Sequence, residues 1–133
     1  GTLGGAIDAF GAPTAMRPVD GSRDACVVRW AHVRLTIRFY NLGGANACAR
    51  RYGYFRHAEI TGRQWRTREG LRVGDPVARV RTLYPHATRR GAFFALLDVP
   101  RQFSATGSYV GLSARVASGR VSGFVVRYPA GGD

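Results

Sequence analysis

Residues 65–87 read WRTREGLRVGDPVARVRTLYPHA and contain the clearest amphipathic helix of the chain. Asp75 and Pro76 favour a helix start, because Asp caps free backbone N–H groups and Pro suits the first helical position. Pro85 marks the end of the helix. The apolar positions recur at intervals of three and four residues: Val77, Val80 and Tyr84. The stretch therefore predicts a short helix with one apolar face.

A shorter form of this pattern opens the chain. Its apolar positions have the same spacing: Leu3, Ala6 and Phe10. Gly11 and Pro13 end this first helix. Both helices are followed by strand-like runs rich in Val, Phe and Arg. We therefore predict one supersecondary unit used twice, with a divergent first repeat at 1–66 and a second repeat at 67–133.

Six runs have the composition and the bounding residues of strands. These runs are 26–31, 33–40, 54–60, 92–99, 109–117 and 120–128. Ser118 and Gly119 join the last two runs into a hairpin, and short connections of this kind give antiparallel pairing. We therefore predict an α+β fold in which two tandem helix-plus-antiparallel-strand repeats form one curved antiparallel sheet, with the short helices on one face.

The run 33–40 shows the clearest alternation in the chain. One set of side chains is apolar and predicts a core face: Val33, Leu35, Ile37 and Phe39. The other set predicts a wet, basic face: Arg34, Thr36, Arg38 and Tyr40. Because side chains of a strand alternate between its two faces, this strand is expected to cover a core and to present arginines to solvent.

The chain has 133 residues and a net charge of +12, and all 20 basic residues are Arg. The absence of Lys excludes a P-loop Lys or a Schiff-base Lys, and the preference for Arg indicates a GC-rich genome. Segment 50–90 is the basic centre, with eleven Arg against three acidic residues. No apolar run approaches the roughly 18 residues that a membrane span needs. The chain begins without Met or a signal peptide, as expected of a processed or trimmed product.

Cys26 and Cys48 are the only cysteines, and they lack the spacing of a zinc or redox motif. Because the pair brackets a predicted hairpin, we predict a disulfide and hence an extracytoplasmic setting. Two buried free thiols are the alternative.

Residues 70–75, GLRVGD, with the apolar positions of the following helix, resemble the opening of β-lactamase-inhibitory-protein-like repeats and of the related SmpA/OmlA lipoprotein module. Residues 112–126 resemble the closing hairpin of the same repeats. This resemblance implies a secreted bacterial protein in which each short helix packs on a small antiparallel sheet. The first half of the chain shares only its helix and residues 33–44 with the pattern, and the strongly basic composition departs from it.

Little in the sequence suggests catalysis or metal binding. The three histidines are scattered without metal-ligand spacing: His32, His57 and His86. Only eight acidic residues are present, so paired carboxylates are scarce. We therefore predict a non-enzymatic protein with no catalytic residue, no metal site and no cofactor. Two enzymatic hypotheses compete with it: a small basic ribonuclease that uses His57, and a Cys–His nucleophile pair if the thiols are free.

Residues 50–57, RRYGYFRH, interleave Arg with aromatic side chains. Three interpretations fit this composition. The first is a protein-binding hot spot, of which Tyr and Arg together are typical. The second is nucleic-acid binding, because the same residues can stack on bases and neutralise phosphates. The third is that Tyr54 or Phe55 belongs to the core and the arginines form a solvated rim.

We predict a secreted or cell-envelope protein that binds a protein partner with an acidic surface through the open face of the sheet. The proposed anchors are Tyr40, Tyr52, Tyr54 and Arg56. The arginines proposed to steer the partner are Arg34, Arg38, Arg50 and Arg51. The alternative partner is a polyanion, either nucleic acid or an anionic wall polymer, bound through the Arg-rich segment 50–90.

Overall fold

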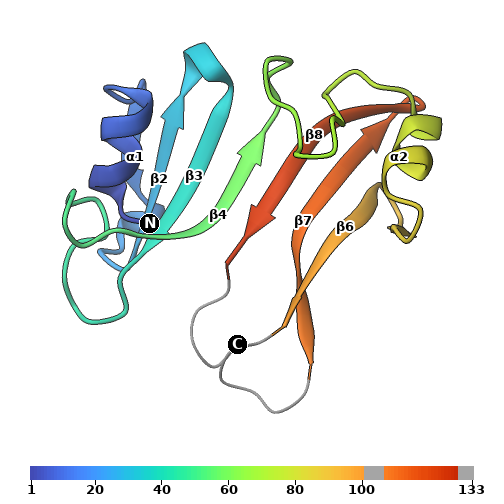
Figure 1. Ribbon diagram of the computed structural model, residues 1–133. Coiled ribbons are helices and arrows are strands. Elements are labelled where there is room, and N and C mark those ends of the chain that lie inside the picture. The colour runs from blue at the N-terminus through green and yellow to red at the C-terminus, as the bar shows by residue number, and fades with distance from the viewer. Residues whose placement is uncertain (101–106, 129–133) are drawn as a thin grey trace. The chain divides into compact units, whose positions relative to one another are not determined.

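A computed structural model describes residues 1–100 and 107–128 of the chain. The chain divides into two compact units, Gly1–Ala58 and Glu59–Asp133. The described residues form two short α-helices and eight strands, and every strand pair with a defined register is antiparallel (Figure 1). The prediction of an α+β fold is confirmed.

The first unit contains one α-helix followed by four strands. These elements are α1 (Leu3–Phe10), β1 (Ala15–Pro18), β2 (Ala25–Trp30), β3 (Leu35–Tyr40) and β4 (Tyr54–Ile60), the last of which crosses the boundary between the units. Their order in the sheet is β1-β2-β3-β4. Short 3-10 turns, Val19–Gly21 and Ala31–Val33, separate β1 from β2 and β2 from β3.

Helix α1 forms despite its two glycines because both of its ends are capped. The Thr2 hydroxyl accepts a hydrogen bond from the backbone N–H of Gly5 at 3.1 Å. Gly11, with φ of 86°, ends the helix and donates its N–H to the carbonyl of Ile7. The helix also lies beside a buried tryptophan, because the ring of Phe10 meets that of Trp30 edge-on at 5.7 Å.

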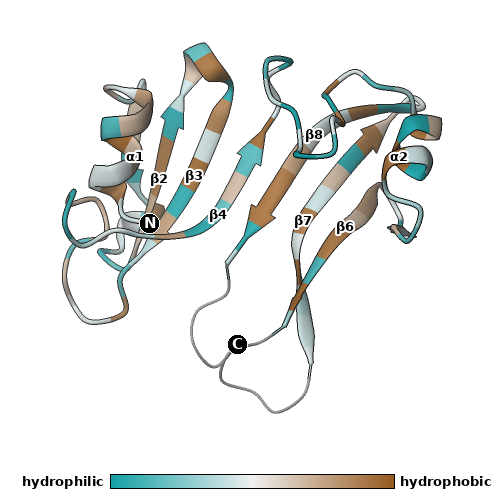
Figure 2. Cartoon of the chain, in the orientation of Figure 1, coloured by the Kyte–Doolittle hydropathy of each residue, from teal (hydrophilic) through white to brown (hydrophobic). Residues whose placement is uncertain are grey.

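The core of the first unit follows the alternation of its strands, and hydrophobic and hydrophilic bands alternate along β3 in Figure 2. Its largest buried side chains come from α1, β2 and β3: Leu3, Val28, Trp30, Leu35, Ile37 and Phe39. The predicted core face of this strand is therefore confirmed from Leu35 onward. Val33 and Arg34 lie outside the strand, because the chain turns there and Arg34 adopts the left-handed conformation at φ of 49°.

The predicted disulfide between Cys26 and Cys48 is present. It attaches the loop that follows β3 to strand β2. Further hydrogen bonds hold the same loop: the Asn41 side chain donates to the Tyr52 carbonyl at 2.7 Å, and the Leu3 N–H donates to the Gly53 carbonyl at 2.8 Å. The loop is therefore fixed to β2 and to the start of α1, and its two ends are joined through Asn41.

Gly53 lies where this loop packs most tightly. A Cβ atom there would stand 2.3 Å from the Ala47 carbonyl oxygen and 3.1 Å from the Cβ of Leu3. We expect Gly53→Ala to lower the free energy of unfolding by about 1–3 kcal/mol, because backbone atoms must shift to admit the methyl group. Urea denaturation measures the change.

Gly5→Ala is the matched control for this substitution. A Cβ at Gly5 meets only the Thr2 hydroxyl, at 3.5 Å, and the residue lies within α1. Because Ala favours a helix more than Gly does, this variant should gain up to about 1 kcal/mol. Equal stability of the two variants would contradict the steric argument at Gly53.

The second unit contains α2 (Val77–Leu83), β5 (Thr88–Arg90), β6 (Phe93–Pro100), β7 (Ser108–Ala117) and β8 (Arg120–Arg127), with antiparallel pairing of β5 to β6, β6 to β7 and β7 to β8. The predicted hairpin is confirmed. Its two turn residues, Ser118 and Gly119, both have positive φ, at 52° and 75°, as the mirror-image turns of tight hairpins require.

The core of the second unit lies between α2 and three strands. Phe94, Ala114 and Phe124 stand in register across β6, β7 and β8. The buried cluster consists of Leu71, Val80, Phe94, Ala114, Val116, Val121 and Phe124. The apolar stripe predicted for α2 is confirmed, because Val80 is fully buried while Val77 and Tyr84 pack against the cluster.

The predicted role of Asp75 as a helix cap is wrong. The N-cap of α2 is Pro76, and no side chain caps it. The Asp75 carboxylate instead accepts a hydrogen bond from the Arg72 N–H at 2.9 Å and pairs with Arg79 at 3.2 Å. Asp75 therefore closes the glycine-rich turn before α2, and its interaction with the helix is a side-chain ion pair.

Candidate functional site

One side of the β1–β2–β3 strands is basic. Register places Arg17 of β1 and Arg38 of β3 on either side of Val27 in β2, while Arg29 lies opposite Thr36. All three arginines are exposed. Arg29 and Arg38 point away from the buried core because they alternate with its residues along β2 and β3, and Arg17 shares their face through its register with β2.

Strand β4 adds an aromatic part to this side. The guanidinium of Arg56 lies over the ring of Tyr40, with 5.1 Å from Cζ to the ring centroid. Tyr54, two residues before Arg56, shares its face of β4 by strand alternation and is 53% exposed. We define the arginine face by six residues: Arg17, Arg29, Arg38, Tyr40, Tyr54 and Arg56.

The arginine face concentrates positive charge. Because Arg17 and Arg38 are two strands apart, their Cα atoms are separated by about 10 Å, and Arg29 lies diagonally between them. In the described part of the chain, none of these three arginines has an ion-pair partner, and strands β1, β2 and β3 contain no acidic residue. The face therefore produces a positive potential that attracts acidic groups.

The structure brings together half of the residues predicted for the site. Arg38, Tyr40, Tyr54 and Arg56 belong to the arginine face. Arg34 lies in the turn at the far end of β3, roughly 20 Å along the strand from Tyr40. Arg50 pairs with Asp8 of α1 at 2.7 Å.

Arg51 and Tyr52 lie in the disulfide-attached loop, where both are exposed. The Leu42 side chain of the same loop is 73% exposed. The backbone of this loop is held by Asn41 and by the disulfide, so these side chains are presented from a fixed position. They form a loop surface separate in sequence from the strands of the arginine face.

Two arginines of this face were missed by the sequence analysis. Arg29 could have been found, because Val27 and Arg29 alternate with the buried residues of β2 in the same way as Arg38 does in β3. Arg17 had no such signal, since β1 is a fully exposed four-residue strand within a Pro- and Gly-rich stretch.

The structure also bears on the chemistry considered for the chain. Both cysteines are in the disulfide, so a Cys–His nucleophile pair is excluded in this form. Within residues 1–100 and 107–128, no group of three or more His, Cys, Asp or Glu side chains could hold a metal ion. In the same ranges, no helix is long and apolar enough to cross a membrane.

Comparison of the chain with protein-family models, with curated proteins and with solved structures finds no match.

Proposed function

We propose that the chain is a non-enzymatic, secreted or cell-envelope protein that binds the acidic surface of a protein partner through the arginine face. The observation that supports this most directly is the side-by-side placement of Arg17, Arg29 and Arg38 on three paired strands without an acidic neighbour on that face of the described strands. Charge of one sign on one face favours encounter with the opposite sign.

The aromatic part favours a protein partner. Tyr and Arg are enriched among residues that dominate binding energy at protein interfaces. Stacking of Arg56 on Tyr40 restricts both side chains before binding, which reduces the entropy lost when a partner docks. Strands also hold their side chains more firmly than loops do.

The polyanion hypothesis rests on the arginines of segment 50–90. Several of these already have partners within the chain: Arg50 pairs with Asp8, Arg79 pairs with Asp75, and Arg81 and Arg89 lie over the ring of Phe94. These contacts weaken the case for a continuous phosphate-binding track. Polyanion binding would in any case show a steep loss of affinity with salt.

The order of elements supports the proposed tandem repeats. Each unit runs from one short helix into strands that pair with their neighbours in sequence. This is the order expected for β-lactamase-inhibitory-protein-like repeats, and the disulfide is compatible with their extracytoplasmic location.

The test compares two variants that lose the same charge. The face variant carries Arg17→Gln, Arg29→Gln and Arg38→Gln. The control carries Arg63→Gln, Arg72→Gln and Arg127→Gln, all exposed in the second half of the chain. A partner protein is first captured on the unmodified chain from envelope and culture fractions, and its affinity for each variant is then measured by calorimetry at low and at roughly 0.5 M salt.

We expect the face variant to bind at least about tenfold more weakly and the control to bind within about threefold of the unmodified chain. Equal losses in the two variants would mean that total charge is recognised, as for a polyanion. Unchanged affinity of the face variant would contradict the proposal.

A further inference from the structure

The second unit contains two adjoining cavities next to the C-terminal end of α2. The first has a volume of about 350 Å³ and is mainly apolar, with the side chains of Ile60, Trp65, Leu97, Leu112, Phe124 and Val126 in its lining. The second has a volume of about 380 Å³ and is more polar. Glu69, Tyr84 and Leu97 line both, so the two cavities meet at these residues.

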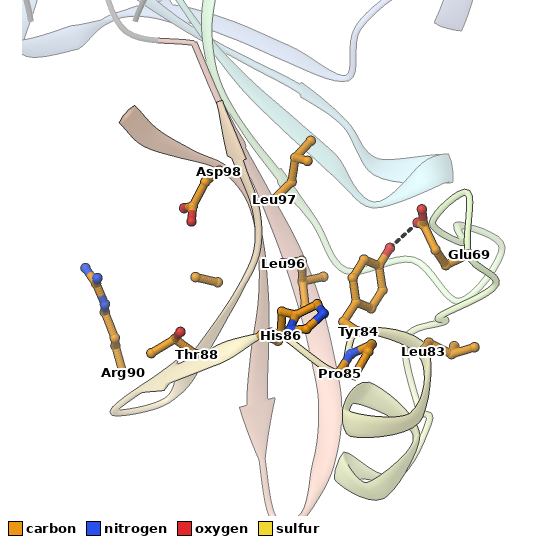
Figure 3. A pocket seen from close by; sticks show the side chains of 12 residues that line it. Glu69, Leu83, Tyr84, Pro85, His86, Thr88, Arg90, Leu96, Leu97 and Asp98 are labelled. Atoms are coloured by element: carbon orange, nitrogen blue, oxygen red, sulfur yellow. Dashed lines mark hydrogen bonds between the residues drawn. The ribbon is translucent and has the colours of Figure 1, made fainter. Parts of the chain in front are cut away.

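The residues between the cavities form a fixed polar group. The Tyr84 hydroxyl donates a hydrogen bond to Oε2 of Glu69 at 2.5 Å, as Figure 3 shows. Burial, together with this bond, raises the pKa of Tyr84 to about 12, while a hydrogen bond from Thr67 opposes the shift. Tyr84 therefore stays protonated at neutral pH and holds the Glu69 carboxylate at the edge of the apolar cavity.

Glu69 keeps binding capacity in this position. Its second carboxylate oxygen, Oε1, has no hydrogen bond or ion pair among the described residues. Leu97, which is 54% exposed, lines both cavities together with Glu69 and adds an apolar surface open to solvent. The site thus combines one carboxylate oxygen that has no protein partner among the described residues with an apolar space.

We infer that these cavities bind a small molecule with a one-ring apolar body and a protonated amine. A volume of 350 Å³ is more than twice the roughly 150 Å³ that accommodates benzene in an engineered cavity, and it falls in the range of small-ligand sites. Trp65 offers an aromatic surface for a ring. An ammonium group would pair with Oε1 of Glu69 through a charge-assisted hydrogen bond.

The charge where the two cavities meet is negative, because Glu69 is the charged residue among the three that line both. Asp98 adds a second carboxylate to the polar cavity, across from His86 and Arg90 (Figure 3). Arg66 and Arg68 also line the apolar cavity. Their neighbours Thr67 and Glu69 interact with Tyr84, whereas both arginines are exposed. An acidic ligand that paired with these arginines would lie close to the Glu69 carboxylate, which has the same negative charge.

The test uses the full chain and two probes of matched shape, 2-phenylethylamine and 3-phenylpropanoate. Binding is followed by amide chemical shifts in nuclear magnetic resonance spectra and by the fluorescence of Trp65. A Trp65→Phe variant identifies the signal of this residue against that of buried Trp30. Glu69→Gln removes the negative charge with little change of shape. Glu59→Gln is its control, because Glu59 is an exposed glutamate of the same unit that lies outside both cavities.

We expect the amine to shift amides of the cavity residues, and the carboxylate to bind about tenfold more weakly or not at all. Glu69→Gln should weaken amine binding about tenfold, as the loss of one charge-assisted hydrogen bond implies, while Glu59→Gln leaves it unchanged. Equal binding of the two probes, or an unchanged amine affinity in Glu69→Gln, would overturn the assignment of an amine. Absence of shifts at the cavity residues with either probe would overturn the site. All cavity residues belong to the second unit, so the outcome is independent of the arginine face.

Discussion

Replacing both Cys26 and Cys48 by alanine is expected to lower the free energy of unfolding by about 3 kcal/mol. The two cysteines are separated by 22 residues in sequence, so their bond removes a large part of the conformational freedom of the unfolded chain between β2 and the loop after β3. Cys26 is fully buried, so the loss of its sulfur atom adds a smaller packing term.

The same substitution should loosen the loop surface. Without the disulfide, the 41–53 loop depends on hydrogen bonds such as those from Asn41 to Tyr52 and from Leu3 to Gly53. Guanidinium denaturation of the oxidised chain and of the double variant measures the stability change. The reduced, unmodified chain is the control, since it loses the bond and keeps both sulfur atoms. If the oxidised and reduced chains unfold at the same denaturant concentration, the disulfide contributes nothing to stability.

Phe94→Ala should be the most damaging single substitution in the second unit, with a loss of about 3–5 kcal/mol. The ring is 1% exposed and belongs to the buried cluster that joins α2 to β6, β7 and β8. Arg81 and Arg89 also place their guanidinium groups 5.4 Å from its centroid. Truncation would leave a cavity and remove both cation–π contacts.

Phe93→Ala provides a matched control for this experiment. Phe93 is the adjacent aromatic residue of β6, it is only partly buried, and a single arginine, Arg115, lies 5.2 Å from its ring centroid. We expect a loss of about 1 kcal/mol in the free energy of unfolding, because Phe93 buries less apolar surface on folding than Phe94 does. Thermal unfolding of both variants separates the two cases. Similar melting temperatures of Phe93→Ala and Phe94→Ala would contradict the central place of Phe94 in the core.

Elements with strong periodicity were predictable from sequence. The alternation through Leu35, Ile37 and Phe39 fixed the buried face of β3, and the spacing of Val77, Val80 and Tyr84 gave α2. Here the local pattern and the tertiary packing agree, since the same residues that alternate also reach the core. The disulfide was predictable because only two cysteines exist.

Short, exposed elements were not predictable. Strands β1 and β5 have four and three residues, all exposed, so neither carries an apolar alternation. They form because their backbone groups hydrogen-bond to a neighbouring strand, and this depends on the tertiary structure and not on the local sequence. The turn at Arg34 was missed for a related reason: a residue with positive φ leaves no mark in an otherwise continuous alternating pattern.

The candidate site shows the same division. Arg38 and Tyr40 could be assigned to one face from the period of β3 alone. The sequence could not show that Arg50 lies apart from these two residues. Its position depends on the ion pair that Arg50 makes with Asp8, 42 positions away in the chain. The cavities beside Tyr84 were not foreseen either, since their lining comes from segments far apart in sequence.

The two short strands carry a consequence for behaviour at high concentration. Among the described residues, β1 pairs only with β2 and β5 only with β6, so each has one row of free backbone groups. Pro18 in β1 lacks an N–H, and β5 holds two adjacent arginines. Short length, proline and like charge all oppose the pairing of one molecule's edge strand with that of another. We therefore expect these edge strands to resist fibril growth, although the chain is rich in strands.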